Sequence, residues 1–237
     1  YSMKHPSWTI TIIALLGFGL TLSAAYWQFK RADYKRELES RFIEMQAKVS
    51  LDLNKTLDPS LELEFRRVNA YGTLDASQRM ILDNRIRRGQ AGYEVLVPLS
   101  ITDSDAVILV NLGWIPRGRN LGQLPDIVIP RSPVVVKGTI VRPGLGALEL
   151  SDVTIEGDIW QNLDLVRYRS LHSIDVLDYV IQSDPIKGVS TNFEQLWSKP
   201  SFGIDTHLSY AGQWIMFAFL ILFFYIYYGF IKQRRDA

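Results

Sequence analysis

The sequence predicts a membrane protein of the α+β class: two transmembrane helices form a hairpin and flank an extracytoplasmic, antiparallel β-rich domain with short helices. Three observations lead to this prediction. Residues 208–231 form a run of 24 residues without a formal charge, and residues 8–29 form another of 22. Between these runs, the hydrophobic period changes to two from Arg66 onward. An uncharged run of about 20 residues can cross a bilayer as a helix, whereas alternation is typical of strands.

The composition excludes several classes of function. The 237 residues carry a formal net charge of +1 and contain no basic tract of the kind that binds nucleic acid. Cysteine is absent, which excludes disulfides, thiolate metal sites and iron–sulfur clusters. The three histidines (His5, His172 and His207) and four scattered methionines argue against a copper carrier. The sequence also has no nucleophile elbow and no zinc-protease motif, so these familiar catalytic templates are missing.

The first apolar run has two interpretations. Ser23-Ala24-Ala25 resembles a signal-peptide cleavage site. The run is longer than the apolar region of a usual signal peptide, so we expect a retained anchor. Its small residues Gly17, Thr21, Ala24 and Ala25 fall near one helical face and allow close approach of a second helix. Ala211 and Ala218 offer a matching stripe on the second run, which predicts that the two spans pack together.

The charges that flank the spans predict their orientation. Lys232, Arg234 and Arg235 follow the second span and favour a cytoplasmic C-terminus. Basic residues also follow the first span, but long domains translocate with little regard to charge. We therefore expect a cytoplasmic N-terminus at residues 1–7, spans at 8–29 and 208–231, an extracytoplasmic domain at 30–207 and a cytoplasmic C-terminus at 232–237.

The middle of the chain begins as a helix and continues as strands. Apolar residues recur at helical spacing over residues 31–49, which predicts that the first helix continues beyond the membrane. Alternating segments bounded by glycine and proline then predict a small antiparallel sheet or barrel. The expected strands are residues 66–74, 79–84, 93–101, 106–114, 134–141, 159–165 and 179–182, with a short helix at 168–178.

A two-span hairpin brings the end of the first span and the start of the second to the same bilayer face. Polar and amphipathic residues gather at both ends: Trp27, Gln28, Arg31 and Lys35 on the first helix, and His207, Tyr210 and Trp214 on the second. An imidazole can bind haem iron, aromatic rings can cover a tetrapyrrole, and cations can pair with propionates. The same residue types also form the ordinary interfacial belt of membrane proteins, so both interpretations stay open.

Five sequence blocks, in order, resemble the surfeit locus protein 1 family, which assists the assembly of cytochrome c oxidase. The resemblance covers nearly the whole chain and includes the two-span layout. The blocks are Trp27-Gln28 with Arg31 and Lys35; Asn84-Arg85 with Gly89, Gly92-Tyr93, Val95 and Pro98-Leu99; Val110-Asn111 with Gly113-Trp114 and Pro116; Gly138 with Arg142-Pro143; and His207 with Tyr210-Ala211 and Gln213-Trp214.

The resemblance implies a bacterial inner-membrane protein that matures haem–copper oxidases. It implies that the chain holds haem a transiently and assists its delivery to oxidase subunit I, as a chaperone and not as an enzyme. In that role His207 would supply the axial nitrogen and the metal ligand, and the remaining six residues would surround the haem: Trp27, Gln28, Arg31, Lys35, Tyr210 and Trp214. The implied partners are subunit I, other oxidase subunits or assembly factors, haem a synthase as a further candidate, and membrane lipid, but no nucleic acid.

A second function fits the same resemblance. The β-rich domain would dock on oxidase subunits as a membrane scaffold, and no cofactor would be bound. Haem content of the purified protein separates this alternative from haem delivery.

Overall fold

The computed structural model describes residues 6–56, 62–117, 127–143, 155–156, 159–190, 192–195, 197 and 202–231. The chain forms two compact units, Tyr1–Phe42 with Lys199–Ala237, and Ile43–Ser198. Lys232, Arg234 and Arg235, on which the expected orientation depends, lie outside the described residues. The helices are α1 (Trp8–Ala47), α2 (Leu165–His172) and α3 (Ile204–Ile226), with a 3₁₀ turn η1 (Ala76–Gln78) and a π-helical turn η2 (Tyr227–Ile231).

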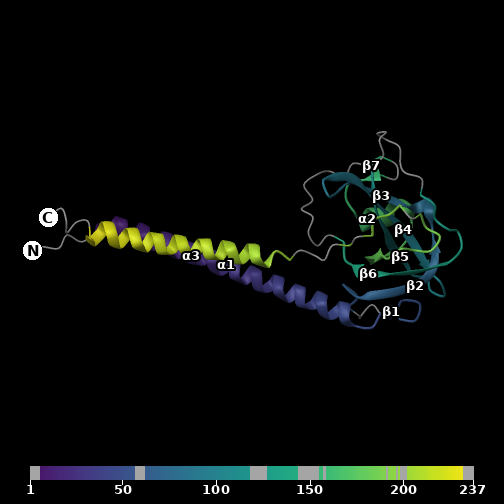
Figure 1. Cartoon of the computed structure of the whole chain (residues 1–237), viewed down its shortest axis with the longest axis horizontal. Coiled ribbons are helices and arrows are strands. Elements are labelled where there is room, and N and C mark those ends of the chain that lie inside the picture. Colours follow the sequence, from purple (N-terminus) through teal and green to yellow (C-terminus); the bar gives the residue numbers. More distant parts are fainter. Residues whose placement is uncertain are drawn as a thin grey trace, which may run out of the picture. The chain divides into compact units, whose positions relative to one another are not determined.

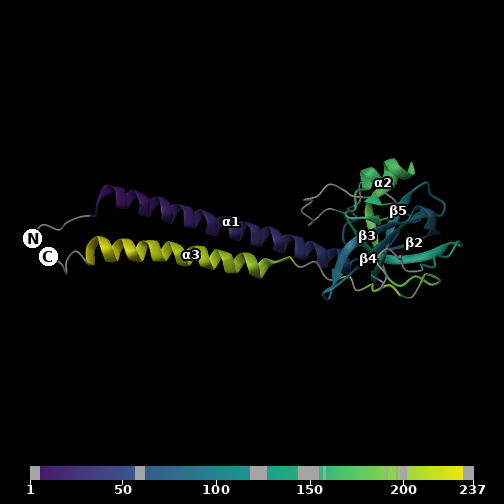
Figure 2. The ribbon, with the colours of Figure 1, turned by 90° about the horizontal axis from the view of Figure 1, so that it is seen from above.

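The first unit contains the antiparallel pair of α3 and most of α1 (Figures 1 and 2). The hydroxyls of Thr11 and Tyr225 lie 2.9 Å apart near one end of the pair. The rings of Phe42 and Phe202 are 6.1 Å apart at the other end. The predicted helix hairpin is therefore present, with the start of α1 beside the end of α3.

Both helices of this pair are long and apolar enough to cross a membrane. α1 continues without interruption for 40 residues, a length of about 60 Å at 1.5 Å per residue. The hydrocarbon core of a bilayer is about 30 Å thick, so the second half of α1 extends beyond a single span, as the sequence predicts. Large apolar side chains, including Ile13, Leu16, Phe219 and Phe223, are exposed along both helices. Their position in a bilayer and the predicted boundaries of the spans stay predictions.

The second unit is built on a nine-stranded sheet. Its ring consists of five strands in the order β2–β6–β9–β5–β4, and the pairing of β4 with β2 closes them into a barrel. Strands β3, β8 and β7 extend the sheet from β4, and β1 extends it from β2. The strands are β1 (Leu51–Asp52), β2 (Arg67–Leu74), β3 (Met80–Arg87), β4 (Gln90–Ile101), β5 (Val107–Pro116), β6 (Val134–Val141), β7 (Ile155–Glu156), β8 (Ile159–Trp160) and β9 (Val176–Ser183).

Barrel closure depends on a glycine. Gly72 of β2 pairs with Ile101 of β4. A Cβ added to Gly72 would lie 2.1 Å from the carbonyl oxygen of Ser100, so any side chain at this position would collide with the backbone of the partner strand. Glycine therefore allows β2 to approach β4 closely enough to complete the ring.

Two hydrophobic clusters lie on the two faces of the sheet. Side chains that point into the barrel, such as Val68, Val95, Val110 and Ile181, form the larger cluster. Leu96 and Leu109 point outward from β4 and β5 and belong to the second cluster, which also contains Trp160 and the α2 residue Tyr168. Strand β5 is buried on both faces for this reason, and its apolar run is nearly continuous.

The structure corrects the predicted sheet in two respects. The ring is not wholly antiparallel, because β5 and β9 pair in parallel. The strand predicted at residues 159–165 ends at Trp160, and the helix predicted at 168–178 instead spans Leu165–His172. The Asp164 side chain accepts a hydrogen bond from the Arg167 amide and starts α2, whereas Ser173 adopts a left-handed conformation and ends it.

Candidate functional site

The contact line of α1 and α3 consists of small side chains. Ala25 and Ala32 of α1 and Ala211 and Ala218 of α3 are all buried. A Cβ added to Gly17 would lie 3.3 Å from Cδ1 of Ile221. Small residues on both faces let two helices approach closely and bring the longer polar side chains beside them into contact.

One such polar contact joins two of the predicted site residues. Nδ1 of His207 lies 2.8 Å from Oε1 of Gln28. Gln28 is only 9% exposed, and His207 is half-buried in the first turn of α3. The end of the first predicted span and the start of the second are therefore level with each other, as the sequence predicts.

This contact determines the chemistry available to the imidazole. An amide oxygen only accepts hydrogen bonds, so with Oε1 of Gln28 toward the ring, Nδ1 of His207 is the donor. In the neutral ring the lone pair then lies on Nε2, the form in which histidine binds metals. A hydrogen bond to the other ring nitrogen also fixes the orientation of a ligating imidazole. Gln28 is thus placed to act as the orienting partner of a ligand at His207.

The other five predicted site residues do not take part in this hydrogen bond. Trp27 is 60% exposed and Tyr210 is 49% exposed. The Arg31 guanidinium lies 5.2 Å from the Tyr34 ring, and the Trp214 ring is 5.8 Å from Phe217. Lys35 is half-buried. Among the described residues, no hydrogen bond or ring contact links these five side chains to His207.

Helical periodicity nevertheless places several of these side chains on one side of the helix pair. At about 100° per residue, Arg31 and Lys35 lie on one flank of the α1 contact line, and Trp27 lies further round the same flank. Tyr210 and Trp214 lie on the corresponding flank of the α3 contact line. Since the two right-handed helices are antiparallel, these flanks face the same side of the pair. His207 lies between them, beside the contact line.

This arrangement offers a single histidine nitrogen and not a multidentate metal centre. Within the described part of the chain, no group of three or more histidine, aspartate or glutamate side chains could hold a metal ion. The helix pair therefore presents one imidazole nitrogen together with exposed aromatic rings and the cations of Arg31 and Lys35.

The sequence prediction missed a second pocket, on the outer face of the sheet in the Ile43–Ser198 unit. Arg85 and Asn111 line this pocket. Both residues belong to the blocks Asn84–Pro98 and Val110–Pro116, which the sequence assigns mainly to turns and strands. A usable signal was Asn111 itself, which is a lone amide within the apolar run of β5.

Comparisons with known proteins identify the family. A sequence model of the SURF1 family matches residues 15–219, which is most of the chain. The chain is similar to Surfeit locus protein 1 of Arabidopsis thaliana, with 31% identity over 127 residues, 48% of this chain and 35% of the relative. It is similar to human Surfeit locus protein 1, with 30% identity over 129 residues, 46% of this chain and 40% of the relative.

A third relative is the cytochrome oxidase assembly protein SHY1 of Saccharomyces cerevisiae, with 24% identity over 177 residues, 69% of this chain and 45% of the relative. The chain thus spans less than half the length of these three relatives. The family match extends from within the first apolar helix to within the second and includes the barrel, so the chain belongs to the SURF1 family.

Proposed function

We propose that this chain is an assembly factor for a haem–copper oxidase that holds haem a at the outer face of the inner membrane and assists its delivery to oxidase subunit I. The proposal is supported by membership of the SURF1 family and by the printed name of the yeast relative, a cytochrome oxidase assembly protein. The observation that carries the haem part is the hydrogen bond between Gln28 and His207.

The residues around His207 fit a haem. Nε2 of His207 would be the nitrogen that holds the haem iron, because Gln28 occupies Nδ1. Tyr210, Trp214 and Trp27 supply aromatic surface for the macrocycle. Arg31 and Lys35 carry the positive charges that pair with propionates. No covalent bond of the haem is made or broken in this role, so the chain acts as a chaperone and not as an enzyme.

The open setting of the site suits transient holding. Trp27 is 60% exposed and Tyr210 is 49% exposed, so a haem held against these rings would stay accessible to an acceptor. A carrier must release its cargo, which requires modest affinity. Subunit I is the proposed acceptor, with other oxidase subunits, assembly factors and haem a synthase as further partners.

The test is purification of the full chain from cells that produce haem a. We expect bound haem a, visible by its absorption spectrum, together with co-purifying oxidase subunits. Stable co-purification of oxidase subunits without any haem would contradict haem holding and favour the scaffold function instead.

The proposed orientation has a separate test. A reporter that is active only in the cytoplasm should be active when fused after Ala237. The same reporter should be inactive when inserted between Arg88 and Gly89, in the turn that joins β3 and β4. Activity at the second position would place the barrel in the cytoplasm and overturn the proposed site of haem transfer.

A further inference from the structure

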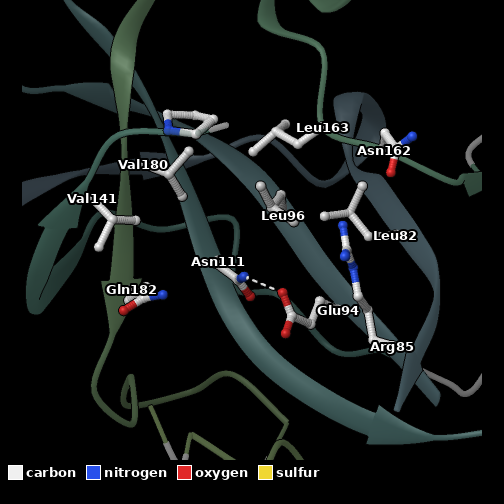
Figure 3. Close-up of a pocket in the computed structure, with 11 residues that line it drawn as sticks. Leu82, Arg85, Glu94, Leu96, Asn111, Val141, Asn162, Leu163, Val180 and Gln182 are labelled. Atoms are coloured by element: carbon white, nitrogen blue, oxygen red, sulfur yellow. Dashed lines mark hydrogen bonds between the residues drawn. The ribbon is translucent and has the colours of Figure 1, made fainter. Parts of the chain in front are cut away.

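The barrel unit has its own pocket, apart from the helix pair. The pocket has a volume of about 210 Å³ and lies on the outer face of the sheet (Figure 3). Leu82 of β3, Leu96 of β4 and Val180 of β9 form apolar walls, and Arg85, Asn111 and Gln182 add polar groups. Apolar walls with a few polar groups are typical of small-molecule sites.

Two β-bulges lie beside the polar groups of this pocket. The pairing of β3 with β4 shifts by one residue between Leu82 and Arg85, and Asn84 adopts a positive φ of 56° there. The pairing of β4 with β5 shifts next to Asn111. Bulges redirect side chains and are common beside functional sites. The bulge in β3 puts Arg85 on the same outward face as Leu82, whereas Asn111 lies opposite Leu96 on that face by regular alternation from Leu109.

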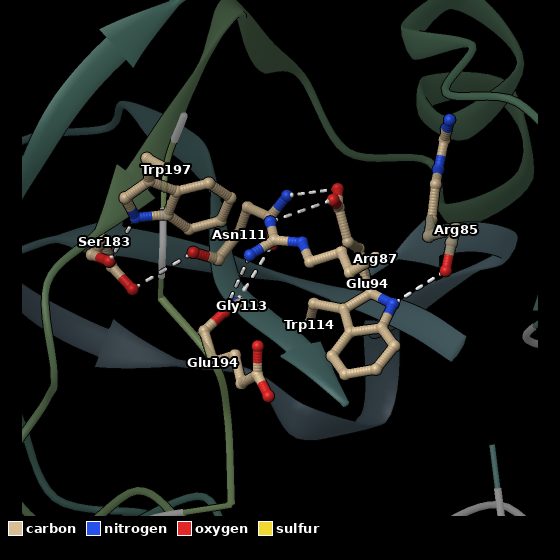
Figure 4. Close-up of polar contacts among 9 residues, drawn as sticks. All are labelled: Arg85, Arg87, Glu94, Asn111, Gly113, Trp114, Ser183, Glu194 and Trp197. Carbon is tan, nitrogen blue, oxygen red and sulfur yellow. Dashed lines mark hydrogen bonds and ion pairs between the residues drawn. The ribbon is translucent and has the colours of Figure 1, made fainter. Parts of the chain in front are cut away.

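Among the described residues that line the pocket, Glu94 is the only carboxylate, and it is already paired. Glu94 accepts a hydrogen bond of 2.9 Å from the Asn111 amide and forms an ion pair of 3.4 Å with Arg87 (Figure 4). Arg87 is held in turn by the carbonyl oxygen of Glu194 and by the Trp197 ring, 5.5 Å away. Glu94 is therefore engaged on both sides and has little capacity to pair with a second cation.

Arg85 is different. Its backbone carbonyl accepts a hydrogen bond from the Trp114 indole, but among the described residues its side chain makes no hydrogen bond or ion pair. Its Nε is buried and has no hydrogen-bond partner within the part of the chain that the structure describes. A buried N–H donor without an acceptor is costly, and carboxylates are among the groups that a guanidinium binds most strongly.

We infer that this pocket binds a carboxylate carried on a small apolar body, with Arg85 as the anion-binding residue. The volume limits the size of that body. A cavity of about 150 Å³ accepts benzene, so about 210 Å³ accommodates a short acid or one apolar residue at the end of a peptide. The amides of Asn111 and Gln182 supply the remaining polar contacts. This inference does not depend on haem binding at His207.

The test uses the full chain in lipid nanodiscs with ¹³C-labelled Leu and Val methyl groups. Three ligands are titrated: hexanoate as a free acid, N-acetyl-leucine as the end of a peptide, and hexanol as an uncharged control. We expect shifts in the methyl signals of Leu82, Leu96 and Val180 with hexanoate or N-acetyl-leucine. Tighter binding of one acid identifies the source of the carboxylate. Hexanol should bind at least about tenfold more weakly, since it lacks the charge-assisted hydrogen bond.

Two variants assign the effect to one residue. Arg85→Gln should weaken binding of the carboxylates by about ten- to a hundredfold and leave hexanol unchanged. Arg88→Gln removes an exposed arginine three residues away and should bind like the unmodified chain. If Arg85→Gln fails to fold, the comparison of hexanoate with hexanol in the unmodified chain still tests the inference. Equal affinity for hexanoate and hexanol, or methyl shifts confined to α1 and α3, would overturn the inference.

Discussion

Nδ1 of His207 and Oε1 of Gln28 lie 2.8 Å apart, although 179 positions separate the two residues in the sequence. The contact joins the first turn of α3 to the middle of α1. The Gln28 oxygen accepts a hydrogen bond from Nδ1–H of His207, and the lone pair of the neutral ring then lies on Nε2, free for a ligand. The haem a proposal depends on this geometry, and the predictions below test its parts separately.

The first prediction concerns the orienting role of Gln28. Gln28→Leu removes the acceptor for Nδ1 of His207, and we expect haem affinity to fall by about ten- to a hundredfold, the usual effect of losing such a partner. Gln28→Glu keeps an acceptor and should retain binding. Haem titration of the purified protein measures both effects. Gln213→Leu, on an exposed position of α3, is the matched control, and an equal loss in that variant would contradict a specific role for Gln28.

The second prediction concerns the register of the helix pair. The chain has no cysteine, so any disulfide that forms comes from the introduced pair of cysteines. Ala25→Cys with Ala211→Cys places two thiols on the contact line and should form a disulfide under mild oxidation. Tyr26→Cys with Gly212→Cys moves each thiol one position, to exposed faces, and should not. Gel mobility after protease cleavage in the barrel reports the cross-link. Equal cross-linking of both pairs would show that the contact line is misassigned.

The third prediction concerns barrel closure. Gly72→Val forces a side chain against the carbonyl of Ser100, and we expect a loss of about 3 kcal/mol of stability from overpacking. Thermal unfolding followed by tryptophan fluorescence measures this loss. Gly212→Ala adds a methyl group inside α3 where nothing lies within 4 Å and should not lower the stability. An unchanged transition in Gly72→Val would mean that β2 and β4 do not close the ring.

The fourth prediction concerns the buried phenol of Tyr168, which donates a hydrogen bond of 2.7 Å to the carbonyl of Gln78. Burial raises the pKa of Tyr168 well above its ordinary value, and the nearby charge of Asp75 acts in the same direction. The folded state therefore favours the neutral phenol. The neutral Tyr168 phenol contributes its full stabilisation below the pKa of tyrosine in the unfolded chain, about 10. This contribution declines as the pH rises above that value.

Comparison with Tyr168→Phe isolates this effect. At neutral pH the variant should be about 1 kcal/mol less stable, because it loses the hydrogen bond. The difference in stability between the two proteins should shrink above about pH 10. There the unfolded tyrosine protein has lost the phenol proton and must bind it again on folding, whereas the phenylalanine variant has no such proton. Chemical unfolding at several pH values measures it. A constant difference up to pH 11 would contradict the buried, neutral phenol.

The local elements were predictable where the sequence carries a clear period. The alternation in β6 predicts its observed bounds, 134–141, and the burial of its residues alternates in the same way. The two apolar runs predict α1 and α3. The segment from Ile159 to Asp178 was less predictable, because its apolar residues suit either period. Asp164, which caps α2, was the available signal.

The pairing of distant strands was not predictable. Nothing in the sequences of β5 and β9 indicates that they lie side by side and run in parallel. The bulge beside Asn111 was not predictable for the same reason, because it depends on the register between β4 and β5. In the helix pair, by contrast, the small residues indicate which faces of the two helices meet. The polar Gln28 and His207 indicate which parts of the two helices lie beside each other. The proximity of these two residues was therefore predictable, whereas the unpartnered side chain of Arg85 was not.

The most direct test of the central claim is the haem a content of three proteins purified from the same haem a-producing cells: the unmodified chain, His207→Ala and His172→Ala. His172 lies on α2 in the barrel unit, against the ring of Tyr168, and serves as the control histidine. We predict equal haem in the unmodified chain and in His172→Ala, and a loss of at least about tenfold in His207→Ala, since the axial ligand is removed. Haem that persists unchanged in His207→Ala would contradict the account.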